Sequence, residues 1–308
     1  MEERFFSYNR YLRDKFSQRV QRISIDAGFS CPNLDGTLST SGCAYCNNKA
    51  FVKFAGSNKS VREQILSSLD FYGRRFKVKK FIAYFQSFSN THADVEQLGR
   101  TYEIIRDFPQ IVGLSVSTRP DCIDKNKLKL ISSFCSDYLV WIEYGLQTTN
   151  DILLASINRG HTYEDFLNTL ELSKKFNLNI GVHMIVGLPG SQYLDHINDA
   201  RRLASLKIQG IKFHAFHVLK ETVYEGLYSQ GKIALMQRQD YVKTVCDMLE
   251  FLPQDLVILR LVPSAYHQYL IAPDWINDKA GVIDQIGKRL QDKKQYQGRL
   301  YENTSHKS

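Results

Sequence analysis

Three cysteines in one glycine-rich stretch have a spacing that suits a metal site. Cys31, Cys43 and Cys46 follow the pattern C-x11-C-x2-C inside IDAGFSCPNLDGTLSTSGCAYCNNKAF. Thiolates bind zinc and iron–sulfur centres, and a loop rich in turns can fold around a metal and donate N–H groups to its sulfurs. The other cysteines lack partners in the sequence and are expected to be small buried hydrophobic residues; they are Cys122, Cys135 and Cys246.

The number of ligands separates the possible metals. Structural zinc needs four ligands, and no histidine lies between residues 1 and 91 to act as the fourth. An electron-transfer cluster also takes four cysteines, whereas three are what a [4Fe–4S] cluster requires when one iron stays open. The spacing therefore favours a [4Fe–4S] cluster with an open iron, and zinc or plain thiols remain as alternatives.

The elements around this loop alternate between strand and helix. Short β-rich segments are predicted at 22–28, 79–86, 111–118, 138–147, 179–188 and 211–219. Apolar residues at helical spacing follow them at 61–76, 94–106, 125–135, 163–176, 192–206 and 239–251. Six such pairs indicate an α/β protein whose parallel sheet curls into a barrel or partial barrel. The cysteine loop follows the first strand, at the end where barrel chemistry takes place.

The predicted strands have one apolar and one small or polar face. In 138–147, Val140, Ile142 and Tyr144 alternate with Glu143, Gly145 and Gln147, and the other strands divide in the same way. An ordinary barrel core is filled by branched aliphatic residues. A lumen lined by Ser117, Glu143, Gln147 and His183 therefore indicates a ligand cavity, although any one of them alone fits a satisfied buried polar group.

The composition predicts a large core and no membrane segment. Of the 308 residues, 43% are hydrophobic and 12% aromatic, yet no apolar run approaches the length that crosses a bilayer. The charged start and the unpaired cysteines fit an unexported cytoplasmic protein. We expect four parts, namely a basic and aromatic extension (1–21), the barrel (22–220), a C-terminal extension with a helix and a β-rich segment (221–278) and a basic, polar tail (279–308) that is a loosely packed helix or partly disordered.

Basic residues are unevenly distributed in a chain of net charge +8. Eight Lys and Arg lie between Lys53 and Lys80, five of them within RRFKVKK, and the tail after residue 279 adds more. Such patches suit a phosphate backbone. Solvated helix ends explain them equally well, so the charge supports a nucleic-acid partner without establishing one.

The three-cysteine loop and the six-fold alternation together resemble the radical S-adenosylmethionine (SAM) enzymes over about residues 20–220. The long gap between the first two cysteines is similar to the YhcC/YtqA-like branch, whose pattern is matched by DAGFSCPNLDG at 26–36 and GCAYC at 42–46. That branch is similar to the catalytic subunit of Elongator, which modifies wobble uridines in tRNA. Four short blocks in order support this relation: TRPD at 118–121, E-x-G-x-Q at 143–147, NRGHT at 158–162 and HM followed by GLPG at 183–190.

The resemblance implies a partial (βα)6 TIM-like barrel with a C-terminal α/β extension, holding a [4Fe–4S] cluster and SAM. It places Tyr45 near the adenine, and Gln147 and Arg159 at the ribose or carboxylate of SAM. The further expected cofactor-binding positions are Gln86, Ser117, Arg119, Glu143 and His183. Two positions depart from the pattern of many relatives. The stretch QSFSN at 86–90 replaces the Gly-Gly-Glu that binds the methionine amine, and Ser117 replaces a glutamate before TRPD.

The implied reaction is reductive cleavage of SAM to a 5′-deoxyadenosyl radical, with an electron from a donor such as flavodoxin or ferredoxin. The implied substrate is tRNA, with conversion of 5-carboxymethylaminomethyluridine to 5-aminomethyluridine at the wobble position. Lys212, His214, Phe216 and His217 are candidates for contact with the base. Two alternatives are a radical SAM enzyme that acts on a small metabolite and a zinc-stabilised RNA-binding module without catalysis.

Overall fold

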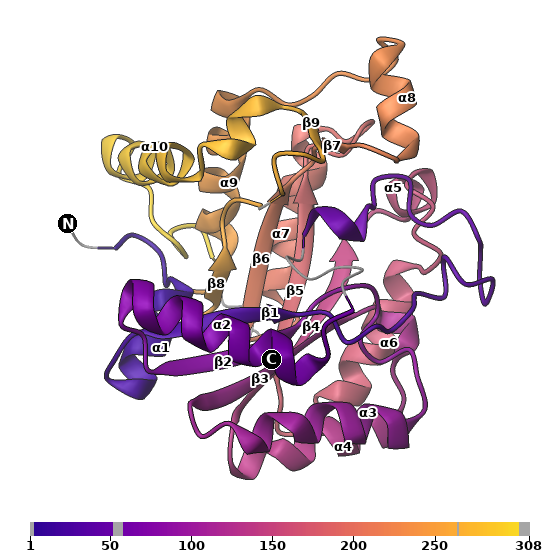
Figure 1. Cartoon of the computed structure of the whole chain (residues 1–308). Coiled ribbons are helices and arrows are strands. Elements are labelled where there is room, and N and C mark those ends of the chain that lie inside the picture. Colours follow the sequence, from indigo (N-terminus) through magenta and orange to yellow (C-terminus); the bar gives the residue numbers. More distant parts are fainter. Residues whose placement is uncertain (1–2, 52–57, 264, 302–308) are drawn as a thin grey trace, which may run out of the picture.

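Seven strands form one parallel sheet in the order β1-β2-β3-β4-β5-β6-β8, curled into a half-barrel (Figure 1). The structure, a computed structural model, describes residues 3–51, 58–263 and 265–301. The strands of the sheet are β1 (Val20–Ile25), β2 (Lys80–Phe85), β3 (Ile111–Thr118), β4 (Leu139–Gln147), β5 (Asn179–Val186), β6 (Gly210–Ala215) and β8 (Val257–Arg260). A separate antiparallel pair, β7 (Val218–Leu219) and β9 (Leu270–Ala272), lies beyond the carboxyl end of β6. The predicted α/β partial barrel with its C-terminal extension is confirmed.

The helices follow the strands as the apolar spacing predicts. Those that connect the barrel strands are α2 (Val61–Phe76), α3 (Val95–Glu103), α4 (Lys125–Ser132), α5 (Asp151–Ser156), α6 (Tyr163–Ser173) and α7 (Tyr193–Ala204). The flanking helices are α1 (Tyr8–Phe16), α8 (Val223–Ser229), α9 (Arg238–Phe251) and α10 (Lys279–Asp292). Helix α2 occupies the predicted range because Ser60 and Glu63 form a reciprocal capping box at its start and Lys77 ends it in a left-handed conformation.

The outward face of the sheet packs under the helices as one apolar core. Val140, Ile142, Tyr144 and Leu146 of β4 all belong to it, as the alternation of that strand predicts. Alternate residues of the same strand point into the half-barrel. This division leaves the concave side of the sheet for the site.

Helix α1 covers the amino end of the half-barrel, where the lumen is filled. Tyr8 and Leu12 of α1 pack with Ile82, Trp141 and Leu259 from three strands. Trp141 is only 1% exposed, and its indole ring meets the ring of Tyr8 edge-on at 5.9 Å between centroids. The lower lumen is therefore a packed core, and the cavity lies towards the carboxyl ends of the strands.

The C-terminal region extends the barrel. Strand β8 joins the sheet beside β6, and α9 packs on both α7 and α10. The expectation of a loosely packed tail is wrong for residues 279–292, because Val282, Ile286 and Leu290 of α10 are completely buried. A helical stripe of three apolar residues in a polar sequence is enough to dock a helix. The tail beyond residue 301 lies outside the described residues.

Two further expectations concern the surface. Within the described residues, no helix is both long and apolar enough to cross a membrane. The basic run RRFKVKK spans the end of α2 and the start of β2, which is the amino end of the strands. A strand of this length places it roughly 20 Å from the end where the cysteine loop lies. Lys53 of the same basic segment is outside the described residues.

Candidate metal and cofactor site

The three cysteines of the loop after β1 open onto one cavity. Cys31, Cys43 and Cys46 line a space of about 270 Å³ at the carboxyl ends of the strands. The loop is built from turns: Gly36 and Gly42 have positive φ angles of 91° and 71°, which residues with a side chain rarely adopt. These turns bring Cys31 and Cys43, which are twelve positions apart, to the same cavity.

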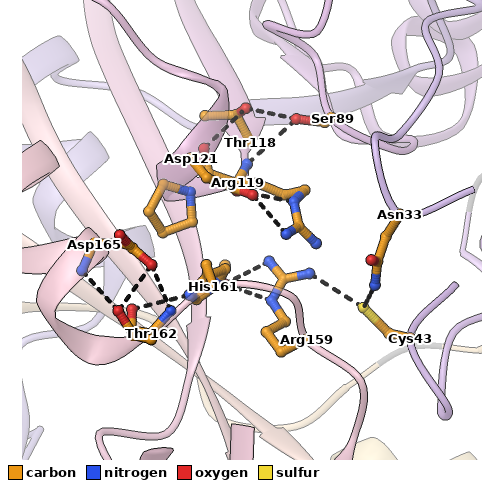
Figure 2. Close-up of polar contacts among 12 residues, drawn as sticks. Asn33, Cys43, Ser89, Thr118, Arg119, Asp121, Arg159, His161, Thr162 and Asp165 are labelled. Carbon is orange, nitrogen blue, oxygen red and sulfur yellow. Dashed lines mark hydrogen bonds and ion pairs between the residues drawn. The ribbon is translucent and has the colours of Figure 1, made fainter. Parts of the chain in front are cut away.

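Nitrogen donors surround the sulfur atoms. The amide Nδ2 of Asn33 lies 3.5 Å and Nη1 of Arg159 lies 3.4 Å from Sγ of Cys43 (Figure 2). Nδ2 of Asn48 lies 3.6 Å from Sγ of Cys46. Such N–H donors stabilise thiolate ligands and tune the clusters that thiolates hold.

Burial and these donors act on the thiols in opposite directions. Burial raises the pKa of Cys46 to about 12 and also raises the pKa of Cys31. Burial would do the same to Cys43, but the guanidinium of Arg159 and the amide of Asn33 lower its pKa below the usual value. Cys43 is thus the thiol that the surrounding protein makes most ready to act as a thiolate ligand.

The donor set fits an iron–sulfur cluster better than a single ion. The described residues contain no group of three or more His, Cys, Asp or Glu side chains gathered closely enough to hold one metal ion. A cubane cluster binds each cysteine at a different iron, so its ligands stand further apart than those of one tetrahedral zinc. Three thiols line a shared cavity, with N–H donors at two of them, and such a set suits a cluster.

The NRGHT segment is fastened to the cysteine loop. Asn33 donates to the carbonyl of Asn158 at 2.6 Å, and Asn158 donates back to the carbonyl of Gly42 at 2.6 Å. The guanidinium of Arg159 also donates to the carbonyl of Gly145 from Nη2 at 2.6 Å. Gly160 has a φ of 74°, and a Cβ there would lie 3.0 Å from the side-chain oxygen of Asn33. The segment is thereby placed so that Arg159 reaches both the sulfur of Cys43 and strand β4.

The TRPD segment forms the neighbouring wall. Arg119 makes a two-pronged ion pair with Asp121, at 2.9 and 2.7 Å, which fixes its guanidinium near that of Arg159 (Figure 2). Its third nitrogen, Nη1, is buried without a partner among the described groups. A buried unpaired donor of this kind is suited to an anionic part of a ligand.

Seven of the eight expected cofactor-binding residues line the same cavity. They are Tyr45, Gln86, Ser117, Arg119, Gln147, Arg159 and His183. Gln147 has a φ of 82°, at a register shift between β4 and β5 that turns its side chain towards the cavity. Strain at a residue that contacts open space is typical of functional positions. The amide of Gln86 donates to the carbonyl of Phe51 at 3.0 Å.

Glu143, the eighth residue, lies behind the cavity wall and is completely buried. One carboxylate oxygen accepts from Ser115 at 2.6 Å and from Arg22 at 3.1 Å. The other oxygen lies 2.7 Å from Nε2 of His183 and 2.9 Å from Nζ of Lys212. Glu143 therefore positions its neighbours in the wall, and its carboxylate is fully occupied.

Lys212 and the last strands complete the inner wall. The ammonium of Lys212 also lies 2.6 Å from the hydroxyl of Tyr84, so its contacts are made within the protein. His214, Phe216 and His217 line the cavity, as expected for residues that could meet a substrate. Nε2 of each of these two histidines is buried without a partner among the described groups.

The sequence interpretation missed Arg22, Tyr84 and Arg260. Tyr84 and Arg260 line the cavity, and Arg22 pairs with Glu143. For Arg22 and Tyr84 the signal was present, because polar residues at alternate positions of apolar strands mark the lumen face. Arg260 follows a register shift between β6 and β8, and alternation along β8 alone would have placed it with Ile258 on the outer face. The expected contacts came from the cysteine loop, the motif blocks, the residue before TRPD and the segments 86–90 and 211–219, and all three of these residues lie outside them.

Comparison with known proteins agrees with this geometry. The family model described as Radical SAM superfamily matches residues 39–203, and that described as Radical_SAM C-terminal domain matches residues 208–292. YtqA of Bacillus subtilis is 33% identical over 310 residues, covering 100% of this chain and 96% of its own length. YhcC of Escherichia coli is 33% identical over 275 residues, covering 89% of this chain and 88% of its own length.

Solved structures share the fold at low sequence identity. The Elp3 protein of the archaeon Methanocaldococcus infernus, with its N-terminus deleted, superposes with a TM-score of 0.65 at 14% identity. The match covers 90% of this chain and 64% of that chain. At this identity the likeness shows a shared fold only.

Proposed function

The chain belongs to the radical SAM superfamily, within its YhcC/YtqA branch, and on that premise we propose that it cleaves SAM to modify a wobble uridine of tRNA. The observation that carries the radical chemistry is the set of three thiols from one loop, sharing a cavity with Arg119 and Arg159. When bound, the cluster and SAM supply one electron and a 5′-deoxyadenosyl radical that takes hydrogen from carbon.

The residues of this chain would hold those groups in defined places. Cys31, Cys43 and Cys46 would ligate three irons, with Asn33 and Arg159 donating to the sulfur of Cys43. The unpaired Nη1 of Arg119 suits the carboxylate of SAM. Tyr45, Gln147 and His183 would enclose the rest of SAM on the remaining walls.

Enclosure also fits radical chemistry. The filled lumen around Trp141 closes the cavity at its inner end, and the cavity lies at the carboxyl ends of the strands. Excluding water and misplaced hydrogen donors prevents side reactions of a reactive intermediate. The protein contributes binding, orientation and shielding, and the electron would come from a separate donor such as flavodoxin or ferredoxin.

The choice of tRNA rests on the ordered blocks that resemble Elongator and on the charge of the cavity. The blocks TRPD, E-x-G-x-Q and NRGHT contribute Arg119, Gln147 and Arg159 to the cavity wall, and GLPG follows the end of β5. Arg119, Arg159, Lys212 and Arg260 line the cavity, and a nucleotide is an anionic ligand that suits such walls. A wobble base is single-stranded, so it can enter a pocket without disrupting a duplex.

The basic run RRFKVKK supports this proposal only indirectly. It lies at the amino end of the strands, on the opposite side from the cavity mouth. A bound anticodon would not reach it directly, although another part of a molecule as large as tRNA has the necessary length. We therefore place the recognition of the reacting nucleotide in the cavity itself.

The test is a comparison of tRNA nucleosides from cells with and without this gene, by liquid chromatography and mass spectrometry. Cells without the gene should accumulate 5-carboxymethylaminomethyluridine and lose 5-aminomethyluridine and its derivatives. A plasmid that encodes the protein should restore the wild-type profile, and one that encodes Cys43→Ala should not. An unchanged profile would remove tRNA wobble uridine as the substrate and leave the radical chemistry to be tested separately.

A further inference from the structure

Arg260 is a cation of the inner cavity wall that the protein leaves without a counter-charge. It is the last residue of β8, it is partly buried, and its Cα pairs across the sheet with that of Lys212 in β6. Within residues 3–51, 58–263 and 265–301, its guanidinium makes no hydrogen bond or ion pair. Guanidinium groups in such places are normally paired.

The carboxylate next to it is already committed. Glu143 pairs with Arg22 at 3.1 Å and with Lys212 at 2.9 Å. Burial holds the pKa of Lys212 well below its usual value, but Arg22 alone already balances the single negative charge of Glu143 before Arg260 is counted. The other neighbours in this part of the wall, Tyr84 and His183, are neutral groups at neutral pH. The inner end of the cavity therefore carries a net positive charge.

The titration of the neighbouring groups agrees with this charge balance. Burial lowers the pKa of Arg260 itself. Burial, followed by the charge of Arg260, holds the pKa of His214 well below its usual value. His214 is consequently neutral, and its buried, unpartnered Nε2 can carry a proton to donate to an acceptor in the cavity.

We propose that Arg260 and His214 form a binding site for an oxyanion of the substrate at the inner end of the cavity. A planar guanidinium and an imidazole N–H are the donors that recognise carboxylates and phosphates. Arg260 and His214 come from β8 and β6, whereas the cations that we place at SAM, Arg119 and Arg159, come from the loops after β3 and α5 around the same cavity. An anionic substrate would supply the counter-charge that Arg260 lacks within the protein.

The identity of the oxyanion rests on the proposed function. In a wobble uridine that carries a carboxymethylaminomethyl group, two sources are available, the carboxylate of that side chain and a phosphate of the same nucleotide. If the carboxylate is held, Arg260 selects the substrate over the aminomethyl product, which lacks it. If a phosphate is held, Arg260 binds both alike.

Two synthetic anticodon stem–loops separate these sources, one with 5-carboxymethylaminomethyluridine and one with 5-aminomethyluridine at the wobble position. Their dissociation constants are measured by fluorescence anisotropy with the cluster-loaded protein and the variants Arg260→Gln and Arg260→Lys. Arg75→Gln is the matched control, because Arg75 is exposed on α2, far from the cavity, and its loss changes the net charge equally. Iron content and thermal midpoint establish that each variant is folded.

Losing a charged hydrogen-bonded contact should weaken binding by about ten- to hundredfold. If Arg260 holds the carboxylate, Arg260→Gln should weaken the binding of the carboxylated stem–loop alone. If it holds a phosphate, Arg260→Gln should weaken the binding of both stem–loops. Arg260→Lys should lie nearer the wild type in either case. The oxyanion site is contradicted if Arg260→Gln weakens neither stem–loop more than Arg75→Gln does. Loss of SAM cleavage without substrate in Arg260→Gln would also contradict it, since Arg260 would then belong to the SAM site.

Turnover of the carboxylated stem–loop is scored separately from binding. A wild-type protein that binds this stem–loop through Arg260 but does not convert it contradicts the proposed reaction and supports the oxyanion site. Conversion and binding that are both unaffected by Arg260→Gln contradict the oxyanion site alone.

Discussion

Replacing Glu143 by glutamine tests the buried charge network that builds the inner wall. The two side chains have the same shape, but glutamine has one oxygen where Glu143 has two. Its amide NH2 must face either Arg22 and Ser115 or His183 and Lys212, and all four donate to the carboxylate. The first orientation takes the acceptor from Arg22, and the second leaves Lys212 with the hydroxyl of Tyr84 as its acceptor. In both orientations the two cations lose their negative charge.

The expected loss follows from this geometry. Breaking a buried ion pair from one side costs about 3–5 kcal/mol, because the remaining charge stays buried and unpaired. The free energy of unfolding of a folded domain is only about 5–15 kcal/mol, so the urea midpoint of Glu143→Gln should fall sharply. Trp141, 1% exposed and two residues away in β4, provides the fluorescence signal for unfolding.

The dependence on pH gives a second signature. Burial alone would raise the pKa of Glu143, but Arg22 and Lys212 hold it well below the usual range. A lowered carboxyl pKa contributes stability that is present above the pKa of the unfolded chain, about 4.3, and is lost as the pH falls through the lower, folded value. The difference in the free energy of unfolding between wild type and Glu143→Gln should therefore have its full value at pH 7 and become smaller below about pH 4.

Two controls make this test decisive. Glu96→Gln removes an exposed carboxylate that pairs with Arg100 at 2.7 Å, and it should change stability by less than about 1 kcal/mol. Adding Lys212→Met to Glu143→Gln should recover part of the loss, since removing both partners leaves fewer unpaired charges. A Glu143→Gln variant as stable as Glu96→Gln would refute the reasoning.

Three further predictions concern other parts of the chain. Burial raises the pKa of Asp199 to about 6, so its ionisation should lower the free energy of unfolding by about 3 kcal/mol as the pH rises from 4 to 6. Asp199→Asn can still accept from Thr149, and urea titrations at each pH should show no such decline for this variant. A Cβ at Gly145 would lie 2.8 Å from Nη2 of Arg159, so Gly145→Ala should lower 5′-deoxyadenosine formation at least about tenfold while the protein still binds iron. Leu12→Ala should destabilise the chain by about 2–5 kcal/mol in urea with unchanged iron content, because Leu12 is 2% exposed in the core that closes the amino end of the lumen.

The sequence predicted what depends on local patterns. The range of α2 was correct because its apolar spacing and its capping box at Ser60 lie within one segment. The two faces of β4 were correct because alternation along a strand needs no knowledge of neighbours. The motif blocks were found through their resemblance to the Elongator-type pattern, which is also read from short local stretches of sequence.

Contacts between distant segments could not be predicted in this way. Asn33 and Asn158, which join the cysteine loop to the NRGHT segment, are 125 residues apart. Arg22 and Glu143 are separated by 121 residues, and nothing in the chain between them indicates that they pair. Glu143 was expected at the cofactor, but its four donors turn it into a support of the wall. Which polar lumen residues face the ligand is decided by these pairings.

Cleavage of SAM by cysteine variants tests the central claim most directly. The protein is reconstituted with iron and sulfide without oxygen, reduced with dithionite and mixed with SAM, and iron and 5′-deoxyadenosine are measured for each variant. Wild type and the control Cys135→Ala, whose thiol contacts the carbonyl of Asn177 away from the cavity, should bind a brown cluster and form 5′-deoxyadenosine. Cys31→Ala, Cys43→Ala and Cys46→Ala should each lose both. Retention of the cluster and of 5′-deoxyadenosine formation in any of these three variants would contradict the account.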